Sequence, residues 1–544
     1  MMAPPPSTNR DQSHGPKKKA CVECRQQKMR CEGDSCDGTV ACARCKRLNI
    51  ACVFSTPYQR VHKRKRLQEL ENETNNLKQE LQSINPATST QSGKTNNNGT
   101  EPRSIDHLEL SPSVIDTCFE RYFNLFHQAL PILDSTMSPN DVYENSTILF
   151  WIIVSVGSRG YEQRPWLVNA LAGPVTQLML ASLNSRIKPL ESIMGILVAL
   201  AWPFPTANYF RDSGFIHCGA LLHMALQCGL HTPYLPYMNV QSFKNDAPLT
   251  EPNILKRAQL WAHVVITYQR ICTGTGQAAL ISFEPYNEQE KFKSILQQLP
   301  ATIQLQLQLS TLVVRAQKTF LEFVASPLDP QQERTLDTVL QMLNSQLDTL
   351  QTSSSSSWDT FHINVARLEF CGMYFFKTPG SMDVQTCQHI FNCTVKVFEH
   401  IRDQHNDHDL HIWCPKYAFQ ACLLGITLML RILKGPYATF VDQERGASLY
   451  QSLVQFTLSC SICQGDLPSR GAAFADSLWK SDKIFKNLNG TFNGGLRIRN
   501  RLAVSVVYDA ILLWKSEIEQ PNEVASRSHT GGPQFTSCIT TCSV

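Results

Sequence analysis

Residues 21–52 read CVECRQQKMRCEGDSCDGTVACARCKRLNIAC, and this stretch decides how the N-terminal end of the chain folds. Six of its cysteines form two copies of the spacing C-x2-C-x6-C, which are Cys21, Cys24 and Cys31, then Cys42, Cys45 and Cys52. Because both copies of the spacing lie within residues 21–52, we expect two similar half-sites related by a pseudo-twofold axis. Cys36 has no counterpart in the second copy, and we expect it to be a spare thiol in the connector.

The number of ligands indicates which metal site these cysteines form. Structural zinc is tetrahedral and takes four ligands, and no histidine lies between Cys21 and Cys52, which excludes Cys2His2 and RING-type sites. One zinc bound by the first two cysteines of each copy, a zinc ribbon, remains an alternative, but it leaves Cys31 and Cys52 unused. Two zinc ions need eight ligand positions, which six thiolates fill only if two of them bridge. Symmetry requires an equivalent bridging pair, such as Cys21 with Cys42, and we expect this binuclear site.

Composition separates a basic N-terminal end from a mildly acidic remainder. The 544 residues are 42% apolar and 18% charged, which permits a large core and argues against wholesale disorder. Formal net charge is only +4, but residues 15–66 hold 14 Lys and Arg against four acidic residues. The remainder then carries 36 basic and 42 acidic residues. This asymmetry predicts a polyanionic partner for the N-terminal end alone.

The sequence lacks the features of a secreted or membrane-spanning protein. The N-terminal sequence MMAPPPSTNRDQSHGPKKK lacks the apolar segment of a secretory signal. The longest apolar runs, 148–156 and 193–204, are shorter than the roughly 18 residues of a membrane span. We therefore expect a soluble intracellular protein without a membrane partner. Its cysteines would be reduced, so a dense group of them favours metal binding over disulfides.

The cysteine segment resembles the DNA-binding domain of the fungal binuclear zinc-cluster (Zn2Cys6) transcription factors. The pattern C-x2-C-R-x2-K-x-R-C, followed by the second C-x2-C-x6-C, carries the resemblance. ACVECRQQK together with YQRVHKRKR is most similar to the branch that contains the leucine-biosynthesis regulator. The resemblance implies two Zn²⁺ ions per chain, bridging by Cys21 and Cys42, and a nuclear location. The connector lacks the proline that many members carry just before the fourth cysteine.

The first copy is the better candidate for reading base pairs. RQQKMR, residues 25–30, contains no Gly or Pro, and we expect it to form a short helix. The resemblance places this helix at the major groove with Lys28 on the bases of a CGG triplet, and a lysine can donate to guanine O6 and N7. The matching position in the second copy is Asn49. Phosphate contacts, which position a protein without specifying sequence, are expected from Arg25, Arg30, Lys46, Arg47, Arg60, Lys63 and Arg64.

These charges also have plainer interpretations. The side chains around the cysteines could be solvated charges beside a metal site. The clusters at 17–19 and 63–66 could bind phosphate or serve as nuclear-import signals, or they could be a charged tail and linker.

A heptad pattern follows the basic linker. Apolar residues with steps of three and four, interrupted by Thr74, predict a short coiled coil over 67–84 with its seam at Leu67, Leu70, Leu77, Leu81 and Ile84. In a parallel dimer Arg66 would face Glu71, and Glu73 would face Lys78. We therefore expect a homodimer. The alternative is a single amphipathic helix packed on the rest of the chain.

The rest of the sequence predicts one large helical domain. Apolar residues recur at helical spacing between Pro and Gly breaks, for example from Ser111 to Phe126 and from Phe215 to Gly229. Blocks such as SPSVIDTCFERYFNLFHQALPILD and HCGALLHMALQCGLHTP resemble the fungal-specific transcription factor domain. That resemblance implies a regulatory domain with a small-molecule effector and the transcription machinery as partners.

We therefore predict a mainly α chain with a small N-terminal Zn2Cys6 cluster, a short coiled coil and a large all-α regulatory domain. The expected segments are a disordered N-terminus (1–16), the Zn2Cys6 domain (17–56), a basic linker (57–66), the coiled coil (67–84), a flexible linker (85–107), the helical domain (108–515) and a disordered tail (516–544).

The predicted function is zinc-dependent regulation of RNA polymerase II genes in the nucleus. The chain would bind double-stranded DNA as a homodimer on paired CGG triplets. One alternative is a corepressor or chromatin adaptor without a promoter site of its own. Another is an enzyme with an N-terminal zinc module, but no set of catalytic residues can be argued from sequence order, and we predict none.

Overall fold

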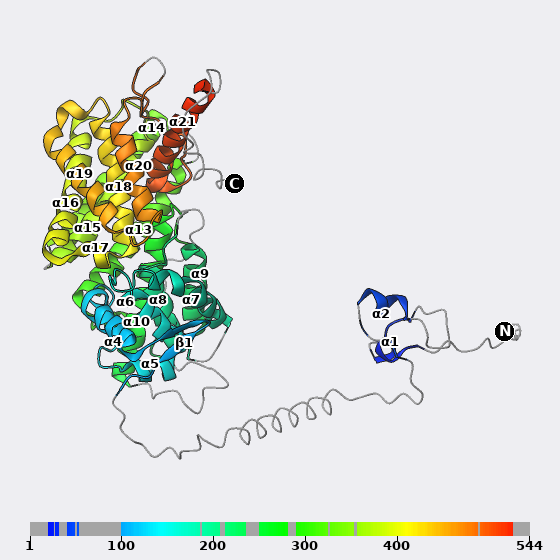
Figure 1. The fold of residues 1–544 in the computed structure, drawn as a ribbon. Helices are drawn as coiled ribbons and strands as arrows, with labels where there is room; N and C mark the ends of the chain where they lie inside the picture. The colour runs from blue at the N-terminus through cyan, green and yellow to red at the C-terminus, as the bar shows by residue number, and fades with distance from the viewer. Residues whose placement is uncertain are drawn as a thin grey trace, which may run out of the picture. The chain divides into compact units, whose positions relative to one another are not determined.

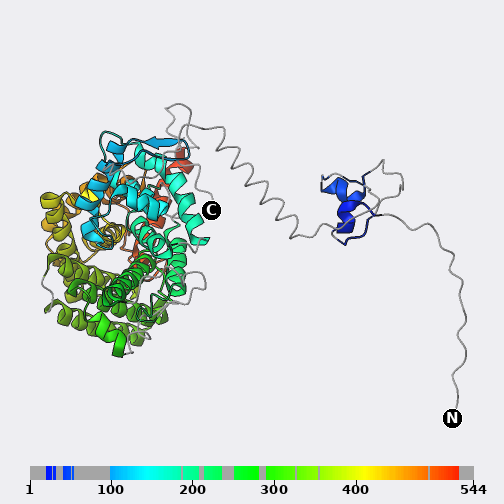
Figure 2. The ribbon, with the colours of Figure 1, turned by 90° about the horizontal axis from the view of Figure 1, so that it is seen from below.

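The computed structural model describes residues 20–31, 41–53 and 99–525. Gaps within these ranges fall at positions 27, 49 and 51 and at 185–187, 207–212, 236–249, 281–289, 325–326, 353–355 and 488–489. The chain divides into two units, Met1–Asn98 and Gly99–Val544, which we call the head and the body (Figures 1 and 2). The predicted coiled coil with Leu67, Leu70, Leu77, Leu81 and Ile84, and the basic linker with Arg60, Lys63 and Arg64, lie outside the described residues.

The head contains two short helices at equivalent places in the cysteine repeat. Helices α1 (Val22–Gln26) and α2 (Ala43–Arg47) each begin directly after the first cysteine of their copy. The backbone N–H groups of Arg25 and Lys46 donate to the carbonyls of Cys21 and Cys42, both at 3.0 Å. Met29 and Ile50 pair with Cys24 and Cys45 in the same way, at 2.9 and 3.1 Å. The sequence repeat is therefore a repeat of backbone structure.

A β-hairpin opens the body. Strands β1 (Arg103–Ile105) and β2 (Leu108–Leu110) are antiparallel, with Ile105 opposite Leu108. Leu110 is fully buried, and the other two apolar residues pack against the core. The prediction of a flexible linker up to residue 107 is therefore wrong at its C-terminal end. The polar composition of this region suggested a linker, but Ile105, Leu108 and Leu110 anchor the segment to the core.

The N-terminal half of the body is a set of helices packed around α6. Its helical elements are α4 (Pro112–Arg121), the π-helical turn η1 (Tyr122–Phe126), the 3-10 turn η2 (His127–Ala129), α5 (Pro139–Asn145), α6 (Thr147–Gly157), α7 (Leu167–Asn184), α8 (Pro189–Ala201), α9 (Gly214–Gln227) and α10 (Glu251–Gly274).

Helix α6 is buried from Ile148 to Gly157 and contacts α4, α5, α7 and α8. Its residues are apolar all round rather than on one stripe, as expected of a central helix. Gly157 permits the close approach to α4, because a Cβ there would lie 1.9 Å from the carbonyl oxygen of Cys118.

The C-terminal half of the body surrounds α18 (Figure 1). Its helical elements are α12 (Glu290–Leu296), α13 (Ala301–Val324), α14 (Pro330–Thr352), α15 (Ser357–Met373), η4 (Tyr374–Phe376), α16 (Val384–His408), α17 (Leu410–Trp413), α18 (Lys416–Leu433), η5 (Ala438–Phe440), α19 (Gln443–Ser459), α20 (Leu467–Lys480), η6 (Leu502–Val504) and α21 (Ser505–Ala525).

Helix α18 joins the two halves because it contacts α8 and α10 as well as α15, α16, α19, α20 and α21. By length and apolar composition α18 could cross a membrane, but 67% of it is buried inside the body, as in the core helix of a globular domain.

The structure confirms a mainly α fold and corrects two details. Helix α9 covers the predicted helix and ends before Gly229, whose φ of 65° suits a helix stop. Phe215, expected on its apolar face, is 41% exposed. Helix α21 continues to Ala525, although we predicted a disordered tail from residue 516. The helix formers in SEIEQ extend it past that boundary.

Candidate metal centre

Four cysteine side chains form the buried centre of the head. Cys21, Cys24, Cys42 and Cys45 are each at most 1% exposed, and their sulfur atoms all lie within 4.8 Å of one another. The Sγ atom of Cys21 lies 3.9 Å from that of Cys42 and 3.8 Å from that of Cys45. A tetrahedral zinc ion with Zn–S bonds of about 2.3 Å holds its sulfur ligands about 3.8 Å apart. The spacing of these thiols therefore fits zinc.

The third cysteine of each copy joins this group. Cys31 and Cys52 are half-buried and pack against the four central cysteines. Each of the two thiols interacts with the thiols of both Cys21 and Cys42. The backbone N–H of Cys42 also donates to Cys52 Sγ at 3.4 Å. Contact of Cys21 and Cys42 with both outer thiols is the arrangement that two bridging thiolates require, whereas a ribbon would leave the outer pair idle.

The thiols of Cys21 and Cys42, the first cysteine of each copy, have lowered pKa values. The backbone N–H of Cys45 donates to Cys42 Sγ at 3.5 Å and, with nearby thiols, lowers the pKa of Cys42 to about 6. Burial acts to raise the pKa of Cys21, but the matching N–H of Cys24, also at 3.5 Å, and other thiols lower it overall. Burial raises the pKa of Cys24 to about 12. Cys21 and Cys42 are therefore the thiols most readily ionised to the metal-binding form.

The sequence analysis missed one contact of the cluster. Arg44 lies on α2, and its Nη1 donates to Cys24 Sγ in the other copy at 4.0 Å. Six thiolates carry more negative charge than two Zn²⁺ ions neutralise, so a half-buried guanidinium beside the sulfur atoms offsets the excess. The sequence does contain a sign of this contact, because the two copies differ at this position. The residue that matches Arg44 in the first copy is Glu23.

The basic residues predicted to face DNA lie on the outside of the head. Lys28, Arg30, Lys46 and Arg47 are exposed, and Arg25 is half-buried. The prediction of a helix over 25–30 is wrong, because α1 begins directly after Cys21 and ends at Gln26. Lys28 follows that end with a φ of 53°, in the left-handed region. The helix begins early because the Cys21 thiol accepts from the Cys24 N–H, as an N-cap side chain does.

A separate cavity of about 210 Å³ lies in the body, between α10, α13, α15, α18, α20 and α21. One wall is apolar and includes Leu309, Val313, Leu424, Phe474 and Trp514.

Another part of the cavity lining is polar. The guanidinium of Arg270 lies 3.9 Å from the ring centroid of Tyr417 and donates to Gln306 Oε1 at 3.0 Å. Burial raises the pKa of the Glu369 carboxyl to about 8, and its Oε2 has no hydrogen-bond partner among the described residues. The cavity thus offers a cation, a neutral carboxylic acid and an apolar surface to a small molecule.

Comparison with known proteins agrees with the head geometry. Residues 19–61 match the family described as "Fungal Zn(2)-Cys(6) binuclear cluster domain". The chain is also similar to the "Regulatory protein LEU3" of Saccharomyces cerevisiae, with 20% identity over 656 aligned residues that cover 92% of this chain and 71% of the relative. Residues 19–61 are thus similar to a Zn2Cys6 domain, and the grouping of their cysteines is consistent with two zinc ions.

Proposed function

We propose that this protein is a nuclear regulator of RNA polymerase II genes that binds paired CGG triplets as a homodimer. The observation that carries the proposal is the head itself, where a cluster with zinc geometry presents exposed basic side chains. The similarity to a yeast regulatory protein supports the regulatory role. The zinc ions would hold the two short helices in a fixed arrangement. The thiolates of Cys21 and Cys42 would each bind both zinc ions.

Lys28 is the proposed base-reading residue. Its position just beyond the end of α1 leaves the side chain exposed, and the left-handed backbone turns the chain away from the helix axis. Lys46 and Arg47 on α2 are exposed, so they are proposed to contact phosphates. Arg25 and Arg30, and the linker residues Arg60, Lys63 and Arg64, are proposed as further phosphate contacts.

Dimerisation is proposed on the heptad of residues 67–84. One head reads about three base pairs, which is too short a site to mark a promoter, and two heads on one coiled coil double it. The test is sedimentation of the full-length chain, with binding to DNA that carries one or two CGG triplets. We expect Leu70→Asn with Leu77→Asn to abolish preference for the two-triplet DNA and to leave zinc content unchanged. A wild-type chain that binds both DNAs equally as a monomer would contradict the dimer.

The body cavity supports a second part of the proposal, regulation by a small-molecule effector. A ligand with an anionic or hydrogen-bonding group would meet Arg270 and the free Oε2 of Glu369, and its apolar part would lie against Phe474 and Trp514. Native mass spectrometry of the full-length chain isolated from fungal cells tests this. We expect a bound small molecule that is lost in Arg270→Gln. A wild-type chain without a bound small molecule, or the same molecule on Arg270→Gln, would contradict the cavity as the effector site.

A further inference from the structure

A second group of metal-ligating side chains lies inside the body. Cys371 on α15 and His389 and Cys393 on α16 place their ligand atoms within 4.8 Å of one another. Cys371 is fully buried, Cys393 is 3% exposed, and His389 is half-buried. Helices α15 and α16 pack directly against each other. The group is thus built across a helix–helix contact, and it contains none of the cysteines of the head.

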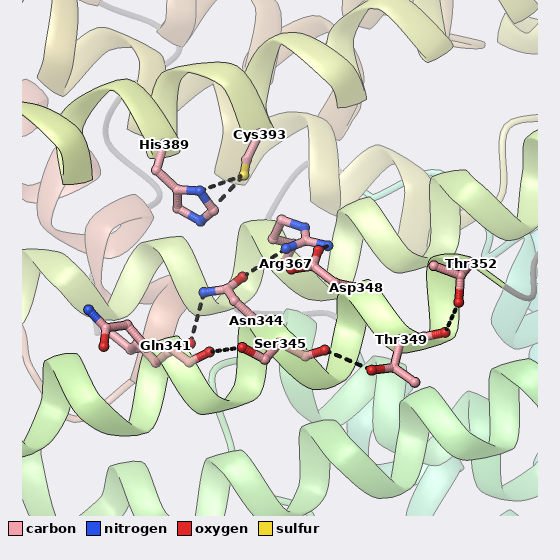
Figure 3. Close-up of polar contacts among 10 residues, drawn as sticks. Gln341, Asn344, Ser345, Asp348, Thr349, Thr352, Arg367, His389 and Cys393 are labelled. Atoms are coloured by element: carbon pink, nitrogen blue, oxygen red, sulfur yellow. Dashed lines mark hydrogen bonds and ion pairs between the residues drawn. The ribbon is translucent and has the colours of Figure 1, made fainter.

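Helical spacing and helix packing together bring the three ligands to one point. His389 and Cys393 are four residues apart, so both project from the same face of α16. The imidazole lies against the thiol, with Nε2 3.7 Å and Nδ1 3.9 Å from Cys393 Sγ (Figure 3). A tetrahedral zinc ion with a Zn–S bond of about 2.3 Å and a Zn–N bond of about 2.0 Å separates such ligand atoms by about 3.5 Å. The pair therefore has the spacing of two zinc ligands.

The charges around the group favour a divalent ion. Arg367, one helical turn before Cys371 on α15, donates to Asp348 Oδ1 at 2.8 Å and to Asn344 Oδ1 at 3.2 Å (Figure 3). Its positive charge is thus already balanced by the carboxylate on α14. Two thiolates and one neutral imidazole would neutralise Zn²⁺ without a residual charge, whereas a monovalent ion would leave a buried negative charge, which is unfavourable.

Other buried cysteines of the body provide the contrast. Cys118 and Cys422 are fully buried among apolar residues. Among the described residues they belong to no group of three ligands, unlike Cys371 and Cys393. Burial of a thiol is therefore common in this body, while two thiols and an imidazole converge, among its described residues, at the contact between α15 and α16.

We propose that Cys371, His389 and Cys393 bind one Zn²⁺ ion in the body, in addition to the two in the head. Three protein ligands leave the fourth tetrahedral position for water or an exogenous ligand. The ion would tie α15 to α16. The ion would then stabilise this helix contact.

Elemental analysis of the full-length chain, purified under reducing conditions with zinc supplied, tests the proposal. We expect three zinc ions per chain in the wild type and two in His389→Gln and in Cys393→Ser. Cys387→Ser is the matched control, because Cys387 is a buried thiol on the same helix that contacts Met382 Sδ and lies outside the group. It should keep three.

His389→Gln keeps the test informative if a cysteine variant misfolds. The half-buried histidine contributes least to core packing, so its variant should retain the far-UV circular dichroism of the wild type while losing one zinc ion. A head-defective chain, Cys24→Ser with Cys45→Ser, should retain the body zinc, and adding His389→Gln should remove one further ion. A wild type with two zinc ions, or three retained in His389→Gln, would overturn the proposal.

Discussion

The head and the body both bury cysteines, but cysteines have different roles in the two units. In the head, Cys21, Cys24, Cys42 and Cys45 are themselves the described core, with Cys31 and Cys52 packed against them. In the body, buried cysteines other than Cys371 and Cys393 lie among leucine, isoleucine, phenylalanine and tryptophan side chains. The described core of the head consists of these cysteines, so we expect metal to supply most of its folding free energy. The body can fold by burying apolar area.

Charged residues show the same division. The head leaves Lys28, Lys46 and Arg47 exposed, where a polyanion can reach them. The body buries its Arg431–Asp509 ion pair completely, with both side chains 0% exposed. We propose that exposed charge in the head serves binding, while buried charge in the body serves structure. Variants that act on one unit and leave the other unchanged test this separation.

Zinc removal should have the largest effect and should act on the head. Apparent zinc-binding free energies of small zinc domains are about 10–16 kcal/mol, so a strong chelator should unfold the head and abolish specific DNA binding. The thermal transition of the body's apolar core should persist. Cys31→Ser sharpens the test, because a ribbon would tolerate it and a binuclear cluster would lose zinc. Unchanged zinc content and DNA affinity in Cys31→Ser would contradict the binuclear site.

Breaking the buried ion pair should have the next largest effect and should act on the body. Asp509 also accepts from the backbone N–H of Arg497 at 2.8 Å, so Arg431→Met leaves a buried carboxylate with one neutral donor. Removing one partner of a buried pair lowers the free energy of unfolding by about 3–5 kcal/mol. Urea unfolding followed by circular dichroism measures it, and zinc content is the control. A loss below about 1 kcal/mol, the range of an exposed pair, would contradict the structural role.

Lys28→Ala should have a smaller effect, confined to sequence preference. If Lys28 reads bases, its loss should weaken binding to CGG-containing DNA by about 1–3 kcal/mol and relax specificity there. Lys46→Ala is the matched control on the second copy. It should weaken all DNAs alike and reduce the salt dependence by about one ion. Equal weakening of random and CGG-containing DNA by Lys28→Ala would remove the base-reading assignment.

The smallest expected effect is a pH dependence of the body. Burial, with a contribution from Arg270, lowers the pKa of His263 from 6.5 to about 4. Between these values the unfolded chain binds a proton that the folded chain excludes, so stability falls as pH falls from about 6.5 to 4. His263→Phe should flatten this loss in melting temperatures measured at pH 7 and pH 5. The exposed His107→Gln is the control, and identical pH profiles for His263→Phe and wild type would contradict the prediction.

Much of the head could be predicted because its information is local in sequence. The repeated cysteine spacing predicted which thiols the structure brings together, and the missing histidines excluded Cys2His2 and RING-type sites. The predicted position of the first helix was wrong, because the Cys21 thiol caps α1 before the basic run begins. Arg44 was missed because its contact with Cys24 crosses between the copies, which spacing alone does not show.

In the body, helical periodicity predicted the fold class and the helices but not the sites. His389 and Cys393 have visible helical spacing, but Cys371 comes from the preceding helix and meets them only through packing. The residues that line the cavity also come from distant parts of the sequence. His362 lies 92 residues from Arg270 and 55 residues from Tyr417. Sites assembled from separate helices depend on tertiary contacts that no single-sequence pattern encodes.

Selection from random DNA by the full-length chain tests the central claim most directly, that a two-zinc head reads paired triplets. The zinc-loaded chain should enrich sequences with two CGG triplets at a fixed spacing and orientation. The Lys28→Ala chain should lose preference within the triplets, and the chelated chain should enrich nothing. A zinc-loaded wild-type chain that enriches no sequence, or one that enriches the same sequences after chelation, would contradict the account.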